Sequence, residues 1–245
     1  MRNKVILTRP KLEQNKIIKK QLEKDFNIKV KILELVEIVP IDFNIKKAIG
    51  IVDLYDCIGF TSQNGVEIFY SYLANYSRDG IEKIRKKTIV AIGPKTAEKI
   101  KQLYNIDNVY IPSEYTSESL EVMLSKMKLK TLLLRSALSR KINLHNVDEI
   151  YIYNLHPIQN KPRIHLNNYD LIILTSSFIT KIFFSKYAAN DFKGFFIPIG
   201  PTTHKELLKY VGVDKIIQHS HSYTISDAVS RVINFLHTRQ NFLEF

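Results

Sequence analysis

An internal duplication constrains the fold of this chain more than any other feature of its sequence. The segment Ile92–Thr96 returns, with one residue changed, as Ile199–Thr203. In both copies an apolar run stops at Gly-Pro, and a helical pattern begins at the proline, whose missing N–H costs nothing at the first helical position. The duplicated unit is therefore a strand, a tight turn and a helix, which leaves backbone N–H groups at the carboxyl end of the strand for an anion.

The duplication extends over most of the chain. Four further pairs of segments recur in the same order: residues 56–62 with 170–176, 115–116 with 223–224, 5–9 with 132–135, and 36–39 with 150–153. Apolar runs of strand length are expected at 4–8, 30–39, 57–61, 88–92, 109–111, 131–134, 149–153, 171–174, 195–199 and 215–217. Helical periodicity is expected at 11–24, 45–55, 66–76, 81–87, 94–104, 117–127, 178–188, 202–210 and 226–237. Strands that alternate with helices at this spacing predict an α/β fold with parallel sheets covered on both faces.

Composition bounds the class of protein. A chain of 245 residues with 45% hydrophobic residues is long enough for one or two packed domains. No apolar run reaches the roughly 20 residues that span a bilayer, and no signal-peptide pattern precedes Val5, so we expect a cytoplasmic protein. The single cysteine, Cys57, lies in an apolar run and is expected to be a packed, inert thiol.

The formal charge of +12 is equally consistent with an anionic partner and with a lysine-rich surface. The chain shows no zinc-finger spacing and no RNA-binding sheet motif, so we expect no nucleic acid as partner. It also lacks a dinucleotide fingerprint, a Walker loop and a metal-ligand cluster with standard spacing. His219 and His221 are the only close histidine pair, and a solvated loop explains them better than a metal site.

Polar groups follow the predicted strands at their carboxyl ends, the edge at which doubly wound sheets bind ligands. They are Arg9, Thr61, Ser62, Gln63, Gly93, Pro94, Lys95, Thr96, Arg135, Ser136, Thr175, Ser176, Ser177, Gly200, Pro201, Thr202 and Thr203. Hydroxyls, backbone donors and arginines suit a carboxylate or a phosphate. The two arginines occupy matching places in the duplication; shared binding of a ligand and simple surface capping both remain open for them. Asp56 and Asp170 fall at the opposite strand ends and are expected to be structural.

Taken together, these segments resemble the uroporphyrinogen-III synthase family. The resemblance is carried by Leu7-Thr8-Arg9-Pro10, Phe60–Val66, Ile92–Ala97, Tyr115-Thr116, Leu134-Arg135, the strand of Tyr153, Thr175–Ser177 and Ile199–Thr203. It implies two flavodoxin-like domains with five-stranded parallel sheets that exchange their ends. One discontinuous domain would comprise residues 1–39 and 157–245, the other residues 41–154, with a hinge of two crossings near Pro40 and His156-Pro157.

The resemblance also implies an activity. The family cyclises hydroxymethylbilane to uroporphyrinogen III with inversion of the last pyrrole ring and loss of water, without metal or cofactor. We expect a monomer, a polycarboxylate substrate received from hydroxymethylbilane synthase, and substrate contacts from the residues above together with Arg140. Tyr153 matches a tyrosine of the family and would be a proton donor to the departing hydroxyl or a buried anchor of the hinge. The first alternative is a non-catalytic two-domain protein that binds an anion, and the second is nucleic-acid binding through the basic surface.

Overall fold

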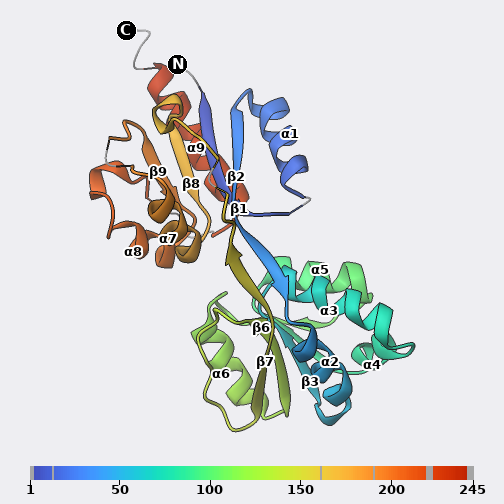
Figure 1. Ribbon diagram of the computed structural model, residues 1–245. Helices are drawn as coiled ribbons and strands as arrows, with labels where there is room; N and C mark the ends of the chain where they lie inside the picture. The colour runs from blue at the N-terminus through green and yellow to red at the C-terminus, as the bar shows by residue number, and fades with distance from the viewer. Residues whose placement is uncertain (1–2, 13, 161, 190, 219–222, 242–245) are drawn as a thin grey trace. The chain divides into compact units, whose positions relative to one another are not determined.

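The computed structural model describes all residues except 1–2, 13, 161, 190, 219–222 and 242–245. Its contacts divide the chain into two compact units, residues 1–37 with 156–245, and residues 38–155 (Figure 1). Two long strands, β2 (Lys29–Pro40) and β7 (Val147–Pro157), run from one unit into the other.

The first unit contains a parallel sheet. Its strands are β1 (Lys4–Pro10), β2, β8 (Leu171–Leu174) and β9 (Phe195–Pro198), and they lie in the order β2-β1-β8-β9. A bridge from Phe196 to Ile216 continues this sheet. Its helical elements are α1 (Gln14–Phe26), η2 (Leu166–Asn168), α7 (Ser177–Lys186), α8 (Pro201–Leu207), η3 (Val213–Lys215) and α9 (Ile225–Asn241).

The second unit repeats this architecture. Strands β3 (Cys57–Phe60), β4 (Thr88–Ala91), β5 (Val109–Tyr110), β6 (Thr131–Ser136) and β7 pair in parallel in the order β5-β4-β3-β6-β7. Its helical elements are α2 (Asp42–Ile51), η1 (Val52–Leu54), α3 (Gln63–Tyr76), α4 (Gly80–Arg85), α5 (Pro94–Tyr104) and α6 (Ser117–Met127).

The sequence duplication is visible in the strand order. Matching β1, β2, β8 and β9 with β6, β7, β3 and β4 gives the same spatial order in both units. The pairing register also shifts at matching places, between Arg9 and Pro10 and between Arg135 and Ser136. The predicted α/β class with parallel, helix-flanked sheets is therefore confirmed.

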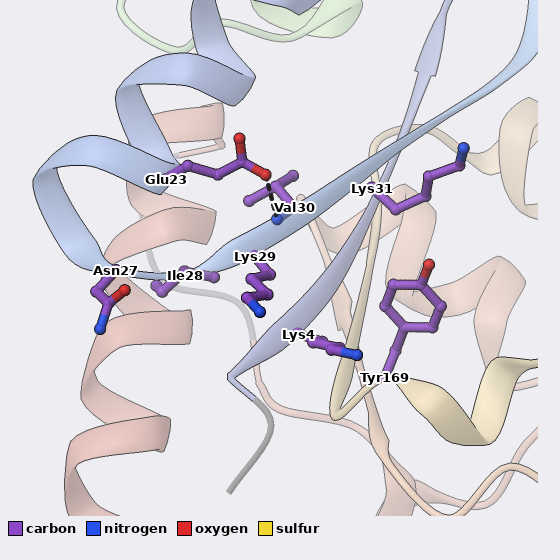
Figure 2. A pocket seen from close by; sticks show the side chains of 8 residues that line it. All are labelled: Lys4, Glu23, Asn27, Ile28, Lys29, Val30, Lys31 and Tyr169. Atoms are coloured by element: carbon purple, nitrogen blue, oxygen red, sulfur yellow. Dashed lines mark hydrogen bonds between the residues drawn. The ribbon is translucent and has the colours of Figure 1, made fainter.

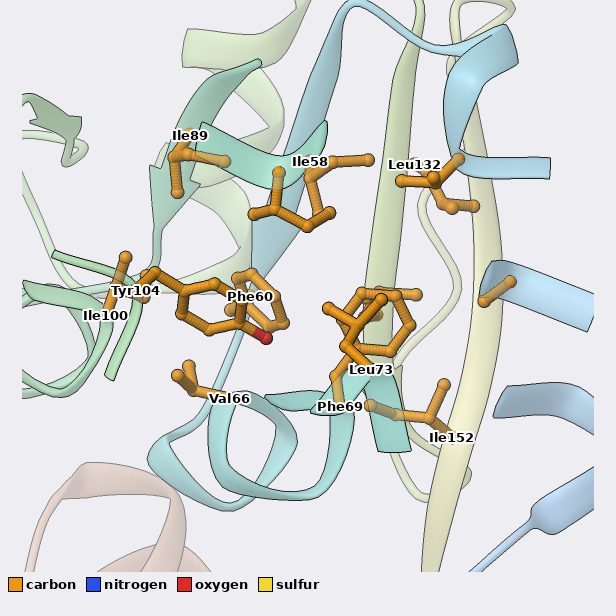
Figure 3. Close-up of a cluster of buried hydrophobic side chains, with 14 of the residues drawn as sticks. Ile58, Phe60, Val66, Phe69, Leu73, Ile89, Ile100, Tyr104, Leu132 and Ile152 are labelled. Atoms are coloured by element: carbon orange, nitrogen blue, oxygen red, sulfur yellow. The ribbon is translucent and has the colours of Figure 1, made fainter. Parts of the chain in front are cut away.

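Both faces of each sheet are buried, which explains the nearly continuous apolar strands. In the second unit, α2 to α5 cover one face, where Phe60, Phe69 and Tyr104 lie close together in a large core (Figure 3). Helix α6 covers the other face, where Leu120 packs with Cys57. Burial raises the pKa of the Cys57 thiol to about 11, so the inert thiol expected there is what the structure shows.

Three element predictions need correction. The helix expected over 45–55 begins at Asp42 and ends at Ile51, and a 3-10 turn follows it. The strand expected over 215–217 is reduced to the single bridge of Ile216. The strand expected over 149–153 is longer and runs from Val147 to Pro157. No helix in the described part of the chain is both long and apolar enough to span a membrane.

Candidate functional site

In the second unit, the predicted polar residues gather at one edge of the sheet. Thr61-Ser62-Gln63 follow β3, Gly93–Thr96 follow β4, and Ser136 ends β6 opposite Tyr153 of β7. Since these four strands are parallel neighbours, their carboxyl ends meet at this edge, where doubly wound sheets bind ligands.

Tyr153 is a nearly buried polar group at this edge. Only 5% of its surface is exposed, and its Oη lies 2.8 Å from Ser62 Oγ. Ser62 is the N-cap of α3 and accepts a hydrogen bond of 3.0 Å from the backbone N–H of Gly65. Burial raises the pKa of Tyr153, while hydrogen bonds with the side chains of Ser62, Ser136 and Asn64 oppose the rise. The phenol therefore keeps its proton at neutral pH and can act as a donor.

In the first unit, hydroxyl groups fix the loop after β8. Thr175 Oγ1 donates to the carbonyl of Thr8 at 2.7 Å, and Thr8 Oγ1 donates to the carbonyl of Ile173 at 2.8 Å. Ser176 caps α7 by accepting from the N–H of Ile179 at 3.1 Å. These two predicted binding hydroxyls, Thr175 and Ser176, thus hold the loop in place.

The two arginines aligned by the duplication differ in their surroundings. Arg135 is 1% exposed; its Nη1 lies 3.1 Å from Glu149 Oε1 and donates to the carbonyl of Arg140 at 2.8 Å. Glu149 also accepts hydrogen bonds from the N–H of Ile142 at 2.6 Å and from the Tyr151 hydroxyl at 3.0 Å. This differs from the expectation that Arg135 faces a ligand, because its guanidinium is enclosed and neutralised by Glu149.

Arg9 has no counterpart of Glu149 in the first unit. The strand register that pairs Leu133 with Glu149 in the second unit pairs Leu7 with Ile32 in the first, so an apolar residue stands where the carboxylate would be. Arg9 is half-buried, and burial lowers the pKa of its guanidinium. Among the residues that the structure describes, Arg9 forms no ion pair. Glu34, the cross-strand partner of Arg9, instead accepts a hydrogen bond of 2.8 Å from Asn15 Nδ2. A partly desolvated cation outside an ion pair is a suitable anchor for a carboxylate.

The other two predicted cations, Arg140 and Lys95, also differ in their surroundings. Arg140 is exposed, and its guanidinium pairs with Glu121 at 2.8 Å and with Glu118 at 3.5 Å, so its charge is already countered. Lys95 is exposed in the first turn of α5, next to Gly93, an N-cap without a side-chain hydrogen bond. Lys95 is therefore the better placed of the two for an anion.

The threonines of the two Gly-Pro turns are not equivalent either. Thr96 and Thr203 are buried, whereas Thr202 and both prolines, Pro94 and Pro201, are exposed at the helix starts. Only Thr202 among these threonines offers its hydroxyl to solvent.

Two tyrosines that the predicted site omitted also lie at these edges. Tyr115 packs on Gly93, and Tyr223 packs on Gly200, in matching positions of the two units. Their signal in the sequence was the repeated Tyr-Thr pair, which was used only to establish the duplication. Glu149 was also omitted, since a single acidic residue in a strand pattern gives no sign of its partner.

One hollow of the first unit lies away from this edge. It has a volume of about 480 Å³ and lies at the amino ends of β1 and β2, where Lys4, Lys29, Lys31 and Tyr169 line it (Figure 2). Glu23 in its wall accepts a hydrogen bond of 3.2 Å from the N–H of Val30. Because ligands of parallel sheets bind at the opposite strand ends, we do not assign the site to this hollow.

The described residues contain no group of three His, Cys, Asp or Glu side chains that could hold a metal ion. His219 and His221 lie outside the described residues. The site residues are therefore hydroxyls, cations, backbone donors and one buried phenol, a set that can bind carboxylates and supply a proton.

Comparisons with known proteins agree on one family. A family model described as uroporphyrinogen-III synthase HemD matches residues 18–230. A Methanocaldococcus jannaschii protein provisionally named uroporphyrinogen-III synthase is 33% identical over 225 residues, covering 84% of this chain and 89% of that protein. A mutant uroporphyrinogen III synthase of the extremely thermophilic bacterium Thermus thermophilus has a similar fold, with a TM-score of 0.59 at 13% identity over 97% of this chain and 99% of that one. The matched span and the identity show that the chain belongs to the uroporphyrinogen-III synthase family.

Proposed function

We propose that this protein is a cyclising lyase that converts hydroxymethylbilane to uroporphyrinogen III, with inversion of ring D and release of water. Family membership over residues 18–230 is the observation that carries the proposal. The test is to supply hydroxymethylbilane, whose consumption should accelerate in proportion to the protein and yield the type III isomer.

The fold supports the two-domain organisation that the family resemblance implies. We propose that the two units are flavodoxin-like domains, residues 1–39 with 157–245 and residues 41–154, joined by a hinge where β2 and β7 cross. The shared strand order, with the second strand at one edge and the first beside it, supports this reading.

The substrate carries an acetate and a propionate on each of its four rings, so binding must satisfy many carboxylates. Arg9 and Lys95 supply cations that form no ion pair within the described chain, and exposed hydroxyls and backbone N–H groups supply further donors. Arg135 is proposed to shape the loop after β6 rather than to contact the substrate, because Glu149 encloses it. The net charge of +12 would favour approach of such a polyanion.

The chemistry requires orientation and one proton. Loss of the hydroxymethyl oxygen as water leaves an electrophilic azafulvene, which ring D attacks at its substituted carbon to form a spiro intermediate. Without the enzyme, the chain closes at the free carbon instead. Holding the flexible substrate so that the disfavoured attack occurs is therefore the main catalytic task.

Tyr153 is proposed to give its proton to the departing hydroxyl. Ser62 Oγ accepts from Gly65 N–H and lies 2.8 Å from Tyr153 Oη, so its own proton can be donated to the phenol oxygen. With Ser62 as the donor in that bond, the proton of Tyr153 is proposed to pass to the substrate. When the proton departs, Ser62 and the N-terminus of α3 would stabilise the phenolate.

The substrate also suggests a source. Because hydroxymethylbilane closes spontaneously to the unwanted isomer, we propose that the protein receives it directly from hydroxymethylbilane synthase. We also propose that the protein is a monomer.

Replacing Arg9 or Lys95 by alanine is expected to weaken substrate binding, by a different amount at each position. Lys95→Ala should cost about 1 kcal/mol or less, as for an exposed ion pair. Arg9→Ala should cost more, about 1.5–3 kcal/mol, because Arg9 is half-buried and its hydrogen bonds to a carboxylate are better shielded from water. The Michaelis constant measures both effects, and Lys31→Ala, in the hollow at the other strand ends, is the matched control. Equal effects from Lys31 and Arg9 would show that only net charge matters.

A further inference from the structure

The two repeated Gly-Pro turns each carry a tyrosine ring. A Cβ atom added to Gly93 would stand 3.2 Å from Cγ of Tyr115, and one added to Gly200 would stand 3.2 Å from Cδ1 of Tyr223. Each ring therefore lies against a glycine, and a larger residue there would have to shift the ring by a few tenths of an ångström. Tyr115 is nevertheless 59% exposed and Tyr223 is 45% exposed.

The local backbone holds both tyrosines in the same way. Each precedes the threonine that caps the next helix: Thr116 Oγ1 accepts from the N–H of Ser119 at 3.1 Å, and Thr224 Oγ1 accepts from the N–H of Asp227 at 3.1 Å. A residue at this position often packs onto its own helix. Here each ring packs instead onto the turn after a different strand, at the carboxyl edge of the sheet.

Core packing does not account for this arrangement. The two units have diverged at most positions, yet both keep the glycine, the tyrosine and their contact. Rings that are about half exposed contribute little to a core, and their retention in both copies indicates a shared use. Aromatic side chains with a few polar groups beside them are typical of sites for small organic ligands.

We propose that Tyr115 and Tyr223 each present an aromatic face to one pyrrole ring of the substrate, an assignment that rests on the function proposed above. A pyrrole is a planar aromatic ring and can stack on a tyrosine or meet it edge to face. In the second unit Lys95 lies two residues after Gly93, so a carboxylate of the stacked ring can reach a cation. The glycine serves to seat the tyrosine ring on the turn.

Binding of uroporphyrinogen III under nitrogen, measured by calorimetry, tests the assignment without requiring turnover. Tyr115→Ala and Tyr223→Ala should each weaken binding by about 3- to 10-fold, and the double variant by about the product of the two effects. Tyr115→Phe should bind as the original protein does, since it keeps the ring. Tyr76→Ala is the control, because Tyr76 is equally exposed at 58% but lies at the opposite end of α3.

Two further variants separate ring recognition from stability. Tyr115→Leu keeps apolar contact with Gly93 without an aromatic face, and should weaken binding while the melting temperature stays unchanged. Gly93→Ala should weaken binding by displacing the ring, whereas Gly50→Ala, where nothing lies within 4 Å of the added atom, should not.

Each outcome has one meaning. If Tyr115→Leu is folded and binds as tightly as the original protein, the assignment is overturned even when the original protein makes uroporphyrinogen III. If the original protein makes no type III isomer but its binding still depends on the tyrosine rings, the proposed activity fails and the assignment of the rings stands.

Discussion

Arg135→Ala is expected to destabilise the protein by about 3–5 kcal/mol, because it leaves the Glu149 carboxylate buried without a counter-charge. The expected loss of stability is large because the side chains of Arg135 and Glu149 are nearly inaccessible to water, at 1% and 7% exposure. The carbonyl of Arg140 would lose its donor as well. Thermal melting should show a decrease of about 6–20 °C for this size of loss.

Two controls isolate the charge. Arg135→Met combined with Glu149→Gln removes both charges and keeps an oxygen acceptor for the N–H of Ile142, so it should recover a large part of the lost stability. Arg9→Ala, at the matching place of the other unit, should change stability by about 1 kcal/mol or less. If Arg9→Ala and Arg135→Ala melted alike, the contrast between the paired and the unpaired arginine would be wrong.

Tyr153→Phe is expected to slow turnover by about 100-fold or more, because it removes the proton donor to the departing hydroxyl. The ring keeps its packing against the first turn of α3, so stability should decrease by only about 0.5–1.5 kcal/mol for the lost hydrogen bond to Ser62. The enzyme product should remain the type III isomer, since orientation of ring D depends on the rest of the site.

Tyr55→Phe is the matched control for this variant. Tyr55 is also a buried tyrosine of the second unit, and its hydroxyl donates to Asp148 at 2.9 Å, but it precedes β3 at the opposite strand end. The Tyr55→Phe variant should lose about as much stability as Tyr153→Phe, and its turnover number should stay unchanged. A folded Tyr153→Phe variant with an unchanged turnover number would assign Tyr153 a structural role and leave orientation as the means of catalysis.

The duplication explains why so much of the fold could be predicted from the sequence. Apolar runs that end in Gly-Pro or Thr-Ser fix where parallel strands stop and helices begin, because proline and the capping serine act locally. The helix expected over 45–55 was misplaced at both ends, because the observed helix is Asp42–Ile51. Its end was predicted too late because the apolar pattern continues into the 3-10 turn of Val52–Leu54.

The candidate site was less predictable, because its properties depend on residues distant in sequence. Arg9 and Arg135 have the same place in the duplication, and only the cross-strand register reveals that Glu149, which encloses Arg135, is replaced by Ile32 at the matching position of the other unit. Likewise, the contact of Tyr115 with Gly93 links two loops that follow different strands. Repeated polar residues could be located from the sequence, but their partners could not.

Chromatography of the oxidised porphyrins formed from fresh hydroxymethylbilane tests the central proposal most directly. The protein, dialysed against a chelator and given no cofactor, should yield mainly the type III isomer, because the proposed steps need only orientation and a proton. A matched sample without protein should yield the type I isomer from spontaneous closure. Only type I isomer at high concentration of the folded protein would contradict the proposed activity.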